Sequence, residues 1–89
     1  MKIKKGFIKR KIIEEYVVVP TGKQNADRRV IIRLNETGSD IWDCILKGKT
    51  PLEIEDFLAG KYEVAQDKAI ISVNGFIEKL KKENLVDDE

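Results

Sequence analysis

The residue types that could do chemistry are few in this sequence. Histidine is absent, so there is no imidazole to act as a general base or a metal ligand. The one cysteine, Cys44, lacks an activating imidazole and cannot alone form a disulfide or a structural zinc site, so we interpret it as a core thiol. The acidic pairs Glu14-Glu15 and Asp87-Asp88 fall in a predicted turn and in the tail, where nothing constrains two carboxylates to work together. The sequence therefore predicts a binding protein without cofactor or metal, and not an enzyme.

Size and charge narrow the class of partner. The chain has 89 residues and a net charge of +1, which predicts one domain with a modest core and argues against binding nucleic acid through overall charge. Apolar runs reach at most four residues, so no membrane span is expected. The single thiol and the absence of a signal-peptide core favour a cytoplasmic location. We expect residues 1–6 and 87–89 to be flexible.

Basic residues are concentrated near the beginning of the chain. Two interpretations of this cluster remain open: a solvated, solubilising face, or a patch that steers an acidic partner. The cluster comprises Lys2, Lys4, Lys5, Lys9, Arg10 and Lys11.

The first third of the chain has the pattern of β-strands. Imperfect alternation over Phe7–Ile13, with Ile8 and Ile12 on one side and Lys9 and Lys11 on the other, predicts a first strand. The run Tyr16–Val19, rich in β-branched residues, predicts a second. Pro20–Asp27 is typical of a loop. Arg28–Leu34 predicts a third strand, with Val30, Ile32 and Leu34 on one face and Arg29, Ile31 and Arg33 on the other.

Three helices are predicted after Leu34. The first spans Glu36–Leu46 with Asn35 as its cap, and Gly38 in its first turn costs about 1 kcal/mol relative to alanine, so we expect a neighbour to approach closely there. Thr50-Pro51-Leu52-Glu53 is a capping box that begins the second helix, which we expect to end at Gly60. The third spans Gln66–Glu83, and Leu85 and Val86 form a short strand or a tucked end. The apolar faces predicted for the three helices are Ile41, Trp42, Ile45 and Leu46; Leu52, Ile54, Phe57 and Leu58; and Ile70, Val73, Phe76, Ile77 and Leu80.

This order of elements predicts an α+β fold, in which a three-stranded antiparallel sheet is followed by a three-helix bundle similar to a winged helix-turn-helix. Ile71 lies on the outer face of the last helix, and Gly75 is close to it. An exposed sheet edge beside that helix could add an extended peptide as a further strand. Ile31, Ile71 and Gly75 would suit such a groove, although each could also be an incidental surface residue.

Several segments together resemble the PqqD family of peptide-modification chaperones, which recognise ribosomally synthesised, post-translationally modified peptides. The resemblance covers about residues 7–87. It is carried by Leu34-Asn35-Glu36-Thr37-Gly38 with Ile41-Trp42, Lys47-Gly48-Lys49-Thr50 with Glu53-Ile54, Tyr62-Glu63-Val64, and Val73, Phe76-Ile77, Leu80 and Leu85.

The resemblance implies a chaperone that binds the leader of a precursor peptide and presents it to a modifying enzyme, such as a radical-SAM protein or a lasso-type leader peptidase. The leader would add to the third strand and pack beside the third helix. Two residues depart from the family pattern: Ala65 stands in place of a capping Asp, and Gly75 in place of a larger polar residue. The implied peptide-binding residues are Arg29, Val30, Ile31, Ile32 and Arg33 on the strand, and Ile70, Ile71, Asn74 and Lys81 on the helix.

Two other functions use the same predicted helical core. A winged-helix DNA-binding protein would present a basic recognition helix, but the last helix has nearly balanced charges: Lys68, Lys79, Lys81 and Lys82 against Asp67, Glu78 and Glu83. A structural subunit of a larger enzyme, without peptide recognition, would need no groove at all. For the peptide-binding function, we expect no nucleic-acid partner and no membrane partner.

Overall fold

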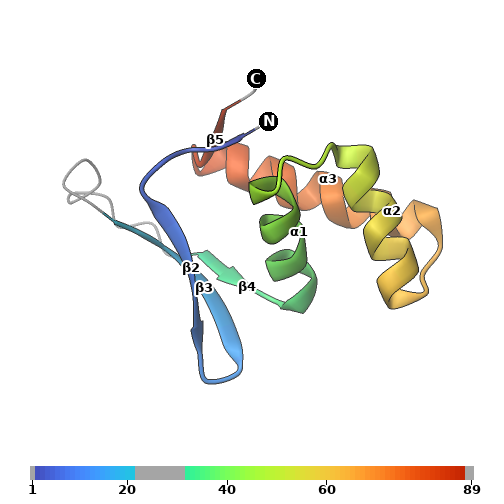
Figure 1. Ribbon diagram of the computed structural model, residues 1–89, viewed down its shortest axis with the longest axis horizontal. Coiled ribbons are helices and arrows are strands. Elements are labelled where there is room, and N and C mark those ends of the chain that lie inside the picture. The colour runs from blue at the N-terminus through green and yellow to red at the C-terminus, as the bar shows by residue number, and fades with distance from the viewer. Residues whose placement is uncertain (1, 22–31, 88–89) are drawn as a thin grey trace.

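The computed structural model describes residues 2–21 and 32–87, and Figure 1 shows the three helices packed on one side of a projecting sheet. Most of the predicted loop and the residues Arg28–Ile31 of the predicted third strand lie outside the described residues. The elements in chain order are β1 (Lys2–Ile3), β2 (Phe7–Ile12), β3 (Glu15–Pro20), β4 (Ile32–Leu34), α1 (Glu36–Leu46), α2 (Pro51–Tyr62), α3 (Gln66–Lys82) and β5 (Val86–Asp87).

The main sheet is antiparallel with strand order β2-β3-β4, so the predicted α+β fold is confirmed. A two-residue turn joins β2 to β3, and Ile12 pairs with Glu15 on either side of it. Strand β4 pairs only with β3 among the described residues, with Arg33 opposite Val17. As predicted, the side chain of Arg33 is exposed, whereas its two neighbours on β4 are buried.

The helices begin where the capping residues predicted. The side chain of Asn35 accepts a hydrogen bond from the Gly38 backbone N–H at 2.7 Å, and the Thr50 and Glu53 capping box begins α2. Helix α3 begins at Gln66, as predicted, although Ala65 provides no side-chain cap. Its last residue is Lys82 and not Glu83.

The prediction that α2 ends at Gly60 is wrong. The helix continues to Tyr62, and Glu63 then takes the left-handed conformation, with φ of 53°. Both added residues contact α1, because Lys61 and Tyr62 donate hydrogen bonds to the carboxylate of Asp40. Tertiary contacts therefore override the local signal of the glycine.

The core lies between the helices and one face of the sheet, with Trp42 completely buried at its centre. Three residues predicted to be on apolar helix faces are exposed instead: Leu46 (61%), Leu52 (63%) and Phe57 (40%). Leu46 lies about 100° around α1 from the buried Ile45, which turns it to solvent. Leu52 and Phe57 lie about 140° apart around α2, on opposite margins of the buried stripe that contains Ile54 and Leu58. Two lysines flank the Phe57 ring. The core consists of Phe7, Val18, Ile32, Leu34, Ile41, Trp42, Cys44, Ile45, Ile54, Leu58, Ala69, Val73, Ile77, Leu80, Leu85 and Val86.

The two ends of the described chain meet in a second, two-stranded sheet. Strand β1 pairs antiparallel with β5, which places Ile3 opposite Val86. Leu85 is fully buried and Val86 belongs to β5, so the final residues are both a tucked end and a short strand. The N-terminal segment that we expected to be flexible includes β1.

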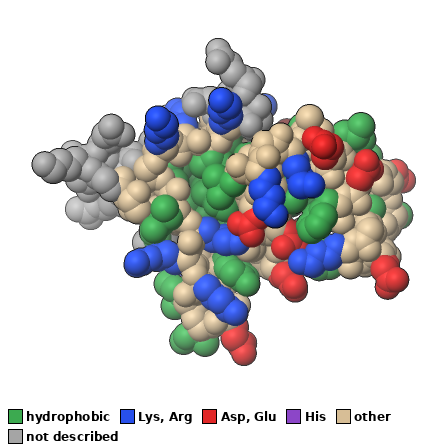
Figure 2. All heavy atoms as spheres, viewed as in Figure 1, with side chains coloured by type: hydrophobic (Ala, Val, Ile, Leu, Met, Phe, Trp, Pro, Cys, Tyr) green, Lys and Arg blue, Asp and Glu red, His purple; other side chains and the backbone are tan. Residues whose placement is uncertain are grey.

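Lys9, a member of the basic cluster, links the main sheet to α1 through hydrogen bonds. The Nζ atom of Lys9 lies 2.6 Å from Ser39 Oγ and 2.8 Å from both carboxylate oxygens of Asp43, and 4.9 Å from the centre of the Tyr16 ring. The face of β2 that carries Lys9 therefore turns towards the helix, and Ile8 and Ile12 are exposed on the other face. Hydrophobic side chains are accordingly visible over the projecting β2–β3 hairpin in Figure 2.

Candidate functional site

A groove of about 530 Å³ lies between the end of β4 and helix α3. Residues from β4 and the start of α1 form one wall and the floor, and the middle of α3 forms the other wall. We call it the β4–α3 groove. Its lining residues are Arg33, Leu34, Asn35, Thr37, Gly38, Ile41, Ile71, Ser72, Gly75, Phe76 and Lys79.

The hydrogen-bond pattern of the sheet shows which backbone groups of β4 face outwards. Thr21 donates its N–H to the carbonyl of Gly6 at 2.6 Å, across the end of the β2–β3 ladder. Backbone groups alternate in direction along a strand, so the odd-numbered residues of β3 point to β2 and the even-numbered ones to β4. The even-numbered residues of β3 are paired with Ile32 and Leu34. The N–H and C=O of Arg33 must therefore point to the open edge.

The α3 wall combines an exposed apolar side chain with a missing one. Ile71 is 71% exposed, and a Cβ placed on Gly75 would meet no atom within 4 Å. Phe76 is half-buried, and its Cε1 atom would lie 3.2 Å from a Cβ on Gly38, so the close approach predicted at Gly38 is confirmed. Phe76 and Gly38 thus contact closely at the base of the groove.

The described residues contain no group of three or more His, Cys, Asp or Glu side chains that could hold a metal ion. Cys44 is buried, as predicted, and burial raises the pKa of its thiol. Within the part of the chain that the structure describes, no helix is long and apolar enough to span a membrane.

One polar cluster ties α1 to α2. Burial alone would raise the pKa of Asp40, but hydrogen bonds from Lys61 and Tyr62, together with the charge of Lys61, lower the pKa overall. Burial and the hydrogen bond to Asp40 raise the pKa of the Tyr62 hydroxyl. Asp40 and Lys61 do not line the β4–α3 groove, so we interpret the cluster as structural.

Comparison with known proteins places the chain in a family. The sequence model of the PqqD family, described as coenzyme PQQ synthesis protein D, matches residues 15–86. The chain belongs to the PqqD family. No curated protein matched the sequence.

Two solved structures have the same fold as this PqqD-family chain. TbiB1 in complex with the TbiA(beta) leader peptide has 25% identity and a TM-score of 0.80, and the match covers 100% of this chain and 98% of that one. Lasso peptide synthetase B1 complexed with the leader peptide has 20% identity and a TM-score of 0.76, with coverage of 94% and 93%. The second likeness concerns the fold alone.

The residues that the PqqD resemblance implied are not all in one place. Arg33 and Ile71 line the β4–α3 groove, and Lys81 lines a neighbouring depression. Ile32 is buried in the core. Arg29, Val30 and Ile31 lie outside the described residues. Ile70 is half-buried and Asn74 is exposed, and neither lines the groove.

Helix geometry explains which α3 residues the sequence reasoning missed. At about 100° per residue, Ile70, Asn74 and Lys81 all lie on one side of Ile71 around the helix, whereas Ser72, Gly75, Phe76 and Lys79 lie on the other. Only the second set lines the groove. The spacing of Ile71 and Gly75, at i and i+4, was the available signal, but it did not show which side of α3 faces β4.

Proposed function

We propose that this PqqD-family protein binds the leader segment of a precursor peptide and presents it to a modifying enzyme, without doing chemistry itself. The observation that carries the proposal is the outward-pointing backbone of Arg33 beside a groove whose lining includes the apolar side chains of Ile71 and Phe76. The enzyme would be a radical-SAM protein or a lasso-type leader peptidase. The leader-peptide complex of TbiB1, which shares the fold over its whole length, supports the assignment.

The leader would bind by strand addition. A peptide strand that pairs with Arg33 would satisfy one N–H and one C=O of the edge, and its side chains would alternate between the groove and solvent. Those on the groove side would contact Ile71 and Phe76 and would use the space left by Gly75. We expect an affinity in the micromolar range, about −8 kcal/mol, which allows the peptide to be handed over.

The opposite edge of the sheet is less suited to the peptide. Because Ile8, Arg10 and Ile12 lie opposite odd-numbered residues of β3, the backbone groups of Lys9 and Lys11 point to the outer edge of β2. Lysines on an edge strand discourage pairing, and Lys9 is also held against α1. Strand β4 is the edge that adjoins the groove.

The experiment measures amide hydrogen exchange by NMR with and without bound peptide. Peptides would first be selected on the full chain from a display library of random 20-residue sequences. The free protein should exchange the Arg33 amide quickly, because it points outwards, and the Ile32 amide slowly. Bound peptide should slow the exchange of Arg33 severalfold or more and leave the Lys11 amide on the β2 edge unchanged.

The result that would contradict strand addition to β4 is equally specific. If a peptide binds and the Arg33 amide exchanges as fast as before, the peptide does not pair with this edge. If the library yields no binding peptide at all, the proposed function itself is wrong.

A further inference from the structure

The charged side chains that line the β4–α3 groove are of one sign. Arg33 stands at the end of one wall and Lys79 at the end of the other, and no carboxylate lines the groove. Within the described part of the chain, the side chains of these two residues have no ion pair or hydrogen bond. Two cations without partners therefore border an apolar floor.

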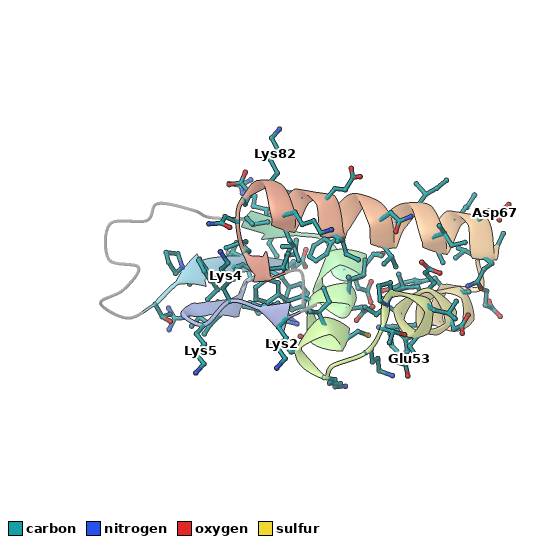
Figure 3. The ribbon with its side chains drawn as sticks, turned by 90° about the horizontal axis from the view of Figure 1, so that it is seen from above. Lys2, Lys4, Lys5, Glu53, Asp67 and Lys82 are labelled. Atoms are coloured by element: carbon teal, nitrogen blue, oxygen red, sulfur yellow. The ribbon has the colours of Figure 1, made fainter. Side chains whose placement is uncertain are left out.

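The positive charge continues beyond the groove along α3. A neighbouring depression of about 580 Å³ shares Gly75 and Lys79 with the groove, and Lys81 and Lys82 line it together with one acidic residue, Glu78. A peptide that leaves the groove along the C-terminal half of α3 would pass these lysines. In Figure 3, Lys82 marks this end of α3, and Asp67 marks the opposite end.

A purely structural explanation covers only part of this pattern. Lysines in the last turn of a helix interact favourably with the helix dipole, which would account for Lys79, Lys81 and Lys82. It does not account for Arg33, which lies on a strand and faces the same groove. Nucleic acid is a poorer ligand than a peptide here, because the groove combines an apolar floor with an open strand edge.

Resting on the proposed function, we infer that the groove selects acidic leader peptides. The peptide segment beside the C-terminal half of α3 carries Asp or Glu, which pairs with Arg33 and Lys79, and the preceding or following residues place apolar side chains on the floor. Because such ion pairs are exposed, each contributes a factor of about two to five in affinity, and the contribution falls as salt rises.

The test compares the peptides that the wild-type chain and charge-reversed variants select from the same random library. The wild type should enrich Asp and Glu. Lys79→Glu and the double variant with Arg33→Glu should lose that preference and favour Lys and Arg. The affinity of the double variant for a selected acidic peptide should fall about tenfold or more, because two ion pairs, each contributing a factor of about two to five, are lost.

Lys47→Glu is the matched control. Lys47 is the C-cap residue of α1, so its reversal disturbs a helix terminus in the same way, but it lies outside the groove. This variant should lose thermal stability to a similar degree as Lys79→Glu and keep the acidic preference. If both variants keep the preference, the lysines of α3 have only a structural role and the inference is wrong.

Two further outcomes separate this inference from the proposed function. Enrichment of neutral or basic peptides, with the Arg33 amide still protected, would refute acidic selection and leave leader binding intact. Labelled duplex DNA that displaces the peptide, with a steep dependence on salt, would assign the cations to nucleic acid and refute the inference. A library without any binder would refute both proposals.

Discussion

Gly75 offers the sharpest separation of recognition from folding. It lies inside α3 and lines the β4–α3 groove, and a side chain there would meet no other atom within 4 Å. Glycine in a helix interior costs about 0.8–1.0 kcal/mol relative to alanine, and leucine has nearly the helix propensity of alanine. Gly75→Leu should therefore stabilise the fold by roughly 0.5–1 kcal/mol. For a domain of this size, that corresponds to an increase in Tm of about 2–8 °C.

The same substitution should weaken peptide binding. A leucine side chain at Gly75 would fill part of the groove of about 530 Å³ where the peptide would lie. We expect at least a tenfold loss of affinity, which is about 1.4 kcal/mol. Tm would be measured by circular dichroism, and affinity by fluorescence anisotropy with a selected peptide.

Gly60 provides the control because it is a second helical glycine in open space. It lies in α2, a Cβ there would also meet nothing within 4 Å, and it does not line the groove. Gly60→Leu should raise Tm by a similar amount and leave peptide affinity unchanged. Equal affinity of Gly75→Leu and Gly60→Leu would show that the peptide binds elsewhere, and a lower Tm for Gly75→Leu would refute the packing argument.

Two further predictions concern the sheet edge and the α1–α2 cluster. Arg33→Pro removes an outward-pointing N–H without breaking the β3–β4 ladder. In anisotropy titrations this variant should bind peptide about two- to tenfold more weakly than Arg33→Ala. Lys11→Pro, on the opposite edge of the sheet, should leave peptide affinity unchanged. The lowered pKa of Asp40 implies stability that is present above about pH 4, the range of an unfolded Asp, and lost as pH falls through the folded pKa. In urea unfolding, the wild type should thus have a larger free energy of unfolding than Asp40→Asn at pH 7, and the difference should disappear towards pH 2. Equal free energies of unfolding at pH 7 would contradict this.

The features that the sequence predicted well are those set by neighbouring residues. The cap at Asn35 and the capping box at Thr50 each depend on a hydrogen bond that spans three residues, and the structure contains both. The end of α2 depends instead on Asp40, which is distant in sequence and holds Lys61 and Tyr62. Periodicity contains no information about such a contact, so the sequence alone predicts that the helix ends at Gly60.

The exposed helix residues show the same limit. Periodicity finds the apolar side of a helix, but the width of the stripe that is covered depends on how its neighbours dock. The i, i+4 pair Ile41 and Ile45 is buried, whereas Leu46, at the margin of the same stripe, is left in solvent. For the site, the outward Ile71 and the unexplained Gly75 were correctly singled out as unusual, but only the position of α3 beside β4 shows which of their neighbours share the groove.

The contact that positions α3 also determines the shape of the groove. Asn35 caps α1 immediately after β4, so the helix begins one residue after the strand ends. Gly38, one turn later, has no side chain, so Phe76 can approach to a distance that a Cβ would make crowded. Helix α3 is thereby held beside the open backbone of Arg33, and Gly75, one residue before Phe76, leaves space on the side that faces the groove. The two glycines thus have opposite roles: Gly38 allows α3 to pack closely, and Gly75 keeps the space above that contact empty.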